Sequence, residues 1–141
     1  MVFDTGTDQD RHALERLERD MIGWLTTVTP DGQPQTFPIW FVWEDGEALI
    51  YSDHHAKRLA NIAANSRVSL HLNDNGQGGD VVVVEGEARV DPAAPPVTEH
   101  TAYLAKYGAW ISDYLASADE MAKTYNVPIR VRPVRGRANG S

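Results

Sequence analysis

The stretch WLTTVTPDGQPQTFPIWFVWEDGEALIYS, residues 24–52, decides the fold class. Two turn signals divide it, PDG at 30–32 and EDG at 44–46. An Asp-Gly pair between apolar runs is typical of a β-hairpin turn. The stretch therefore predicts three consecutive strands, over 23–29, 34–43 and 47–52.

The rest of the chain predicts three more strands and several helices. The further strands are 67–73, 81–90 and 127–135, and Pro133 interrupts the last or places it at an edge. A polar, glycine-rich segment at 73–80 is expected to be a flexible loop. Helical patterning covers 8–22, with Asp8 as N-cap, 55–65, and then 97–107 and 111–125 with Trp110 between them. We therefore expect a mainly β chain with helices, built as a six-stranded antiparallel barrel rather than a parallel α/β sheet.

Composition limits the function classes. The 141 residues suit a single domain, 1–141, with 1–7 and 136–141 expected to fray. The net charge of −7 argues against a nucleic-acid partner. No apolar run approaches the ~20 residues that span a membrane, and no signal peptide is evident, so a cytoplasmic protein is expected. The absence of cysteine excludes thiolate metal sites, and we predict no metal site, because adjacent His54 and His55 rarely converge on one ion.

The predicted strand 34–43 is apolar on both faces. Its alternating faces are Phe37, Ile39, Phe41 and Trp43 on one side and Thr36, Pro38, Trp40 and Val42 on the other. A strand with one solvent-exposed face should carry polar residues on that face. The strand is either fully buried in the centre of a sheet, or its second face covers a flat cofactor ring or a partner subunit. Pro38 lacks an N–H, which leaves neighbouring backbone groups free to bond a ligand.

Two adjacent cations, Lys57 and Arg58, fall in the first turn of the predicted helix 55–65. Cations are disfavoured there, because the N-terminus of a helix carries about +0.5 of an elementary charge. A bound anion would explain them, since free N–H groups at a helix start favour phosphate and the two side chains add charge-assisted bonds. Ser52 could add a hydroxyl donor. Alternatively, both side chains reach solvent or pair with Asp53. The stripe Leu59, Ile62 and Ala63 is expected to be buried.

In their order and spacing, four segments resemble a known family. They are L-x-T-V-x-P-D-G-x-P-Q-x-x-P-I-W-F-x-W (25–43), Y-S (51–52), K-R-L-A-N-I-x-x-N-x-R-V-S-L (57–70) and V-x-V-E-G-x-A (82–88). This pattern resembles the split β-barrel fold of pyridoxamine 5′-phosphate oxidases and of their actinobacterial relatives that use the deazaflavin F420. The resemblance covers about residues 12–91 and implies a six-stranded split barrel that forms a homodimer with two cofactor sites at the subunit interface.

The resemblance also implies roles for individual residues. Lys57 and Arg58 match the phosphate-binding pair, and Ser52 matches a hydroxyl at the end of the preceding strand. The segment Phe37, Pro38, Ile39 and Trp40 matches the strand along the edge of the flavin. The oxidases carry an arginine and a lysine on that strand, where this chain has Pro38 and Trp40. This departure favours the F420 branch over oxidation of pyridoxamine phosphate.

The activity that the resemblance implies is hydride transfer from reduced F420 to a small-molecule acceptor. The alternatives are an FMN-binding oxidoreductase of the same fold and a ligand-binding barrel without turnover. No catalytic residue is assigned, although Tyr51, Tyr103, Tyr107 and His71 could each protonate a product. The C-terminal arginines, Arg132 and Arg137 among them, either reach the acidic tail of the cofactor or form a solvated tail.

Overall fold

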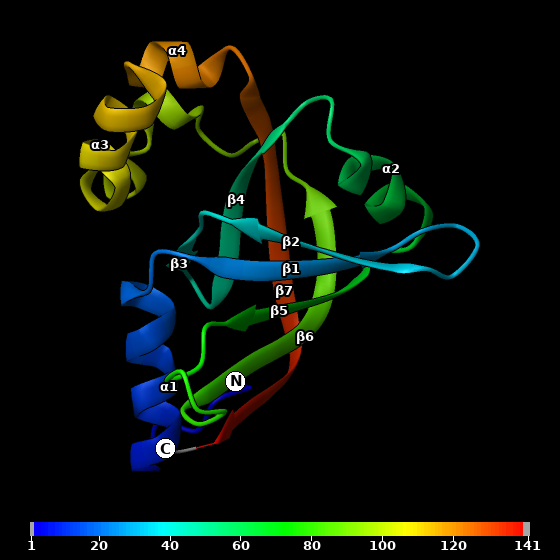
Figure 1. Ribbon diagram of the computed structural model, residues 1–141, viewed down its shortest axis with the longest axis vertical. Helices are drawn as coiled ribbons and strands as arrows, with labels where there is room; N and C mark the ends of the chain where they lie inside the picture. The colour runs from blue at the N-terminus through cyan, green and yellow to red at the C-terminus, as the bar shows by residue number, and fades with distance from the viewer. Residues whose placement is uncertain (1, 140–141) are drawn as a thin grey trace.

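A single curled antiparallel sheet of seven strands, in the order β2-β1-β5-β6-β7-β4-β3, forms the body of the protein (Figure 1). The computed structural model describes residues 2–139. The strands are β1 (Gly23–Val28), β2 (Pro34–Ile39), β3 (Val42–Glu44), β4 (Glu47–Asp53), β5 (Arg67–Leu72), β6 (Val81–Val90) and β7 (Tyr125–Asn139). The helices are α1 (Asp8–Arg19), α2 (Lys57–Ala64), the short 3-10 helix η1 (Val97–Glu99), α3 (Thr101–Leu115) and α4 (Ala118–Ala122). This is the mainly β fold expected from the sequence.

The strand predicted at 34–43 is two strands, so the sheet has seven strands rather than six. The break falls at Trp40 and Phe41, between β2 and β3. At this break the backbone of Phe41 bonds to side chains of α3 instead of to a neighbouring strand. Its N–H donates to the Tyr107 hydroxyl at 2.9 Å, and its carbonyl accepts from Lys106 Nζ at 2.7 Å. The helix therefore satisfies the backbone groups that a continuous strand would have paired.

The predicted helix bounds also need correction. Helix α1 ends at Arg19, and its N-cap is Thr7 rather than Asp8, because the Thr7 hydroxyl accepts from the N–H of Asp10. The predicted segment 97–107 starts as η1, and the predicted segment 111–125 contains α4 after a break. No break falls at Trp110, which lies inside α3 with its ring centroid 6.1 Å from that of Tyr107. The chain leaves this helix at Ala116, whose φ of 66° breaks the helical path.

Parts of both chain ends are held in place where fraying was expected. Residues 136–139 belong to β7 and pair with β6, and Phe3 is only 1% exposed. The Phe3 ring lies against Gly136, where an added Cβ would come within 2.8 Å of it. Residues 1, 140 and 141, also expected to fray, lie outside the described residues.

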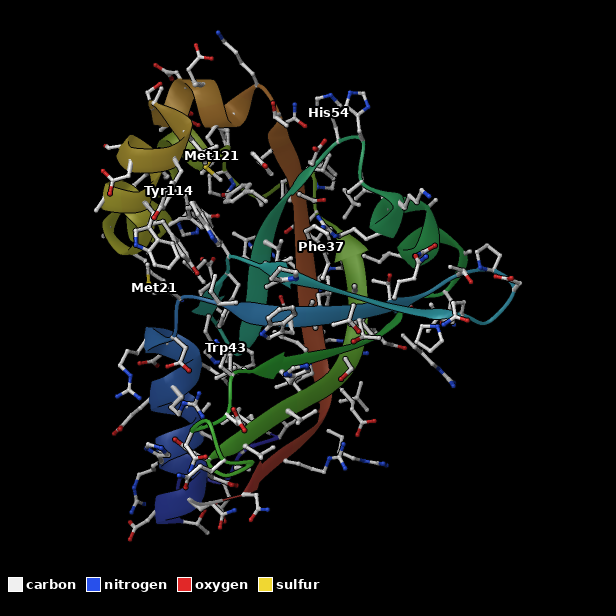
Figure 2. All side chains as sticks on the ribbon, viewed as in Figure 1. Met21, Phe37, Trp43, His54, Tyr114 and Met121 are labelled. Atoms are coloured by element: carbon white, nitrogen blue, oxygen red, sulfur yellow. The ribbon has the colours of Figure 1, made fainter. Side chains whose placement is uncertain are left out.

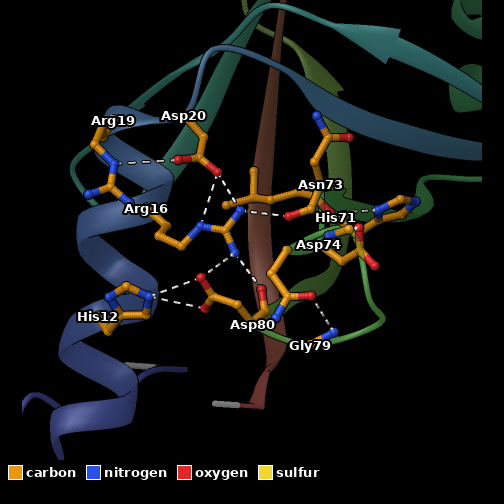
Figure 3. Close-up of polar contacts among 12 residues, drawn as sticks. His12, Arg16, Arg19, Asp20, His71, Asn73, Asp74, Gly79 and Asp80 are labelled. Carbon is orange, nitrogen blue, oxygen red and sulfur yellow. Dashed lines mark hydrogen bonds and ion pairs between the residues drawn. The ribbon is translucent and has the colours of Figure 1, made fainter. Parts of the chain in front are cut away.

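Helix α1 is tied to the segment 73–80 by Arg16 (Figure 3). The Arg16 guanidinium is 6% exposed and bonds the Asp20 carboxylate at 2.5 Å, the Asn73 carbonyl at 2.6 Å and the Asp80 carbonyl. Within the segment, Asp74 accepts from the N–H groups of Gly76 and Gly78. The segment expected to be a flexible loop is therefore held at both of its ends.

Two separate clusters of buried side chains form the core. The first lies inside the curled sheet, where α1 contributes Ala13 and Leu17. The second lies between the β3–β4 hairpin and the helices α3 and α4, which form a lobe at the end of the molecule away from the termini (Figure 1). This second core fixes the lobe over one end of β2 and β4. No helix within residues 2–139 is long and apolar enough to cross a lipid bilayer.

Candidate functional site

The two cations of the α2 first turn lie in a hollow of about 600 Å³ between α2, the β1–β2 hairpin and the start of β7. It is lined by Leu25, Thr27, Gln35, Thr36, Phe37, Asp53, His55, Ala56, Lys57, Arg58 and Tyr125. The N-cap residue, Ala56, provides no side-chain cap, and the first turn carries no acidic residue. Helix α2 therefore begins with an uncapped positive end and two added positive charges, which together favour an anion.

Arg58 is half-buried and held in place. Its Nη1 donates to Ser52 Oγ at 2.9 Å, and its guanidinium lies 5.1 Å from the centroid of the Phe37 ring. Burial lowers the pKa of Arg58, against the opposing field of Asp53. Among residues 2–139, no carboxylate forms an ion pair with Arg58 or with Lys57, so neither cation is neutralised by Asp53 at contact distance. Lys57 is exposed along the rim of the hollow.

Ser52 lies behind Arg58 rather than in the hollow. It is 1% exposed, its oxygen accepts from Arg58, and its hydroxyl donates to the Asp53 carbonyl at 3.1 Å. In this arrangement the serine orients the guanidinium. The prediction that Ser52 itself donates to a ligand stays untested.

An apolar cavity of about 310 Å³ adjoins the hollow and shares Phe37, Arg58 and Tyr125 with it. Its walls come mainly from β2, β4 and the α3–α4 lobe, with one residue each from α2 and β7 at the edge shared with the hollow. They are formed by Phe37, Pro38, Ile39, Trp40, Ile50, Tyr51, Arg58, Tyr103, Tyr114, Leu115, Met121 and Tyr125. Phe37 projects from β2, while Tyr114 and Met121 belong to the lobe (Figure 2). The four predicted residues Phe37 to Trp40 thus line one continuous site with Lys57 and Arg58.

The second face of the predicted strand 34–43 is only partly free. Trp40 stacks on Tyr107 of α3, with ring centroids 4.9 Å apart and planes at 3°, and Val42 is buried in the second core. At these two positions the chain's own helix covers the face, so neither a ring nor a second subunit is needed there. The other interpretation, a fully buried central strand, is wrong for β2, an edge strand whose residues 34–38 are exposed.

The candidate proton donors are separated by the structure. Tyr51 and Tyr103 line the apolar cavity, whereas Tyr107 and His71 do not. The Tyr51 hydroxyl donates to the Pro95 carbonyl at 2.5 Å, and burial, with the Glu44 charge, raises its pKa to about 12. His71 stacks on Trp24, with centroids 6.4 Å apart, away from the site.

Among the described residues, no arginine of β7 lines the hollow or the apolar cavity. Arg132 forms an ion pair with Glu87, and Arg137 lies opposite Val83 in the register of β6 and β7. Within residues 2–139, no three His, Cys, Asp or Glu side chains are grouped to hold a metal ion.

The sequence interpretation missed the wall that the lobe supplies. Tyr103, Tyr107, Trp110 and Tyr114 recur at intervals of four, three and four residues, which places them on one face of α3. This aromatic stripe was the available signal. Because two helices were expected there, broken at Trp110, the stripe was divided between them.

Comparison with known proteins concerns the whole chain and its fold. The family profile described as pyridoxamine 5′-phosphate oxidase matches residues 10–139. No curated protein matches the chain. A solved F420 reductase is 25% identical, with a TM-score of 0.60, covering 87% of this chain and 94% of its own.

Two further solved structures share the fold. An FAD-binding protein from Mesorhizobium loti is 22% identical, with a TM-score of 0.67, covering 89% of this chain and 90% of its own. The heme storage protein HutZ from Vibrio cholerae is 13% identical, with a TM-score of 0.66, covering 95% of this chain and 96% of its own. At these identities the likeness shows a common fold alone.

Proposed function

Because the chain belongs to the pyridoxamine 5′-phosphate oxidase-like family of split β-barrels, we propose that it is an F420-dependent oxidoreductase that reduces a small-molecule acceptor. The observation that carries the proposal is the position of Arg58. It lies half-buried and without an ion pair among the described residues, at the junction of a cation-lined hollow and an aromatic cavity. A ligand with an anionic group joined to a flat ring fits this pair of spaces.

The residues present suit such a cofactor. Lys57 and Arg58 would hold its phosphate, helped by the uncapped start of α2. The exposed ring of Phe37 and the walls at Pro38, Ile39 and Trp40 would receive its ring. Reduced deazaflavin supplies a hydride when bound, and the protein supplies position and electrostatics. The 25% identical F420 reductase supports this choice of cofactor.

Two alternatives keep the same site. FMN also joins a phosphate to a flat ring, and the structural neighbour from Mesorhizobium loti is an FAD-binding protein. A barrel that binds a ligand without turnover is the other alternative, since HutZ, a heme storage protein, shares the fold. The cation-lined hollow serves each of the three, so the choice among them depends on the binding and turnover experiment.

We propose further that two copies of the chain form a homodimer around this site. The edge strand β2 is exposed from Pro34 to Pro38, and the Phe37 side chain is 59% exposed at the mouth of the cavity. An exposed edge strand with a large apolar side chain is a feature that proteins usually cover. A second copy seated there would close the site. Sedimentation equilibrium checks this, and a monomer at all accessible concentrations contradicts it.

The proposed function is tested by titrating the purified protein with F420 and, separately, with FMN. Trp40 lines the cavity, so quenching of tryptophan fluorescence reports ring binding. We expect tighter binding of F420 than of FMN, and oxidation of reduced F420 when acceptors are supplied. Tighter binding of FMN points to the flavin alternative, and binding without turnover over a broad acceptor panel points to the ligand-binding barrel.

A further inference from the structure

The hydroxyl of Tyr103 is an unused hydrogen-bond donor beside the apolar cavity. Tyr103 is 1% exposed, and its side chain lines the cavity. It is the one buried tyrosine of residues 2–139 whose hydroxyl has no hydrogen-bond partner among them, because Tyr51 bonds Pro95 and Tyr107 bonds Phe41. This hydroxyl is therefore free to donate to a bound ligand.

The free hydroxyl belongs to a side chain that lines the cavity. No fully enclosed side-chain oxygen or nitrogen of the non-exposed described residues lacks a partner. The Tyr103 oxygen has none, so it is not fully enclosed, and the cavity is the space that its side chain lines. The ring is held by Tyr51 and Tyr107, at centroid distances of 5.0 and 4.9 Å, which restricts where the hydroxyl can point.

The other residues that line the cavity indicate which kind of ligand the hydroxyl would contact. Arg58, at the edge shared with the hollow, is the one charged side chain among the described lining residues. The other walls are aromatic or aliphatic, which favours a planar uncharged ring. Burial raises the pKa of Tyr103, so its hydroxyl stays protonated and can donate a hydrogen bond.

We propose that Tyr103 is a specificity-determining residue that donates a hydrogen bond to a carbonyl oxygen on a planar, uncharged ring bound in the apolar cavity. The inference rests on the proposed function in taking this cavity as the ligand site. The carbonyl could belong to the cofactor ring or to the hydride acceptor, and the two sources share the chemistry that Tyr103 would recognise. The hydrogen bond selects for the carbonyl, while the aromatic walls select for flatness.

The test uses two planar probes of nearly equal shape, 9-fluorenone and fluorene, which differ by one carbonyl. The wild-type protein should bind fluorenone roughly three- to tenfold more tightly than fluorene, the effect of one neutral hydrogen bond. Tyr103→Phe keeps the ring and removes the hydroxyl, so this preference should disappear. The infrared carbonyl stretch of bound fluorenone should lie at lower frequency in the wild type than in Tyr103→Phe.

The control separates ligand recognition from folding. Without ligand, Tyr103→Phe should unfold at the wild-type temperature, because no hydrogen bond is lost. Tyr107→Phe removes hydroxyl bonds to the backbone and should lower that temperature. The same two variants are then titrated with F420.

Weaker F420 binding in Tyr103→Phe identifies the cofactor ring as the carbonyl source, and weaker fluorenone binding with unchanged F420 binding identifies the acceptor. Equal affinity of wild type and Tyr103→Phe for both probes, with no shift of the carbonyl stretch, overturns the inference. A wild type that fails to bind F420 counts against the proposed function alone, because the fluorenone comparison is still readable.

Discussion

Arg58 Nη1 lies 2.9 Å from Ser52 Oγ, which links the second residue of α2 to the end of β4. The Ser52 hydroxyl donates in turn to the Asp53 carbonyl, so the backbone of β4 sets the direction of the guanidinium. An arginine that is oriented in this way loses little further conformational freedom when an anion binds. This relationship favours a fixed anion site over a solvated surface charge.

Removing the two cations should weaken binding of a phosphate-bearing cofactor while leaving the fold intact. The double variant Lys57→Ala with Arg58→Ala should raise the dissociation constant at least about tenfold, since a hydrogen bond to a charged group contributes roughly 1.5–3 kcal/mol. Isothermal titration with F420 measures the change. Arg67→Ala removes an exposed arginine outside the site and serves as the control. An unchanged dissociation constant in the double variant would refute the phosphate role.

Asn61 should matter for both stability and binding. It is 5% exposed, and its side-chain amide donates to Thr27 Oγ1 and to Gln35 Oε1, both at 3.0 Å. Asn61→Ala should lower the free energy of unfolding by roughly 1–3 kcal/mol, because a buried polar oxygen is left without its donor. Urea denaturation measures this loss. Gln35 lines the hollow, so F420 affinity should fall as well, and a variant with wild-type stability would contradict the assignment.

The sequence was most informative where local chemistry alone determines the structure. The PDG and EDG turns and the strands predicted at 23–29 and 47–52 were predicted closely, because hairpin turns depend on adjacent residues. Lys57 and Arg58 do occupy the first two positions of α2. The buried stripe of that helix was only partly correct: Ile62 is buried, whereas Ala63 is exposed and Asn61 is buried in its place.

The errors arose where distant segments decide the structure. The break at Trp40 and Phe41 depends on Lys106 and Tyr107, more than sixty residues later in the chain. The alternation of side chains along residues 34–43 gives no information about these distant partners. For the same reason the apolar character of Trp40 and Val42 could be assigned to a cofactor or a subunit, when a helix of the same chain accounts for it.

Tyr107→Phe should loosen the junction of β2 and β3. The Tyr107 hydroxyl accepts from the Phe41 N–H at 2.9 Å and lies 2.7 Å from the Met21 carbonyl. Losing these bonds should cost roughly 1–3 kcal/mol of unfolding free energy. Since Phe41 directly follows Trp40, a looser junction should shift the tryptophan emission to longer wavelength in the folded variant. An unchanged spectrum and unchanged stability would show that the junction does not depend on this hydroxyl.

Gly86 should not tolerate a side chain. An added Cβ would lie 2.3 Å from the Arg132 carbonyl oxygen, next to the register shift between β6 and β7. Gly86→Ala should therefore destabilise the protein by several kcal/mol or prevent folding, because the clash is with backbone. Gly108→Ala is the matched control, since nothing lies within 4 Å of its added Cβ on α3. That change should stabilise by about 0.5–1 kcal/mol in chemical denaturation, and equal effects at the two sites would contradict the argument.

Lys106 should give stability a pH dependence of known sign. Burial lowers the pKa of Lys106 from 10.5 to about 8, although the Asp20 charge opposes the shift. Between these pH values the unfolded chain binds more protons at this position than the folded one, so unfolding becomes less favourable as pH rises. The cost of burying the ammonium is fully present below pH 8 and is lost above the unfolded pKa of 10.5.

The unfolding free energy of the wild type should therefore rise relative to that of Lys106→Met between about pH 8 and 10.5. Lys123→Met removes an exposed lysine and should show no such rise, and a flat difference for Lys106→Met would mean that the ammonium stays hydrated in the folded protein.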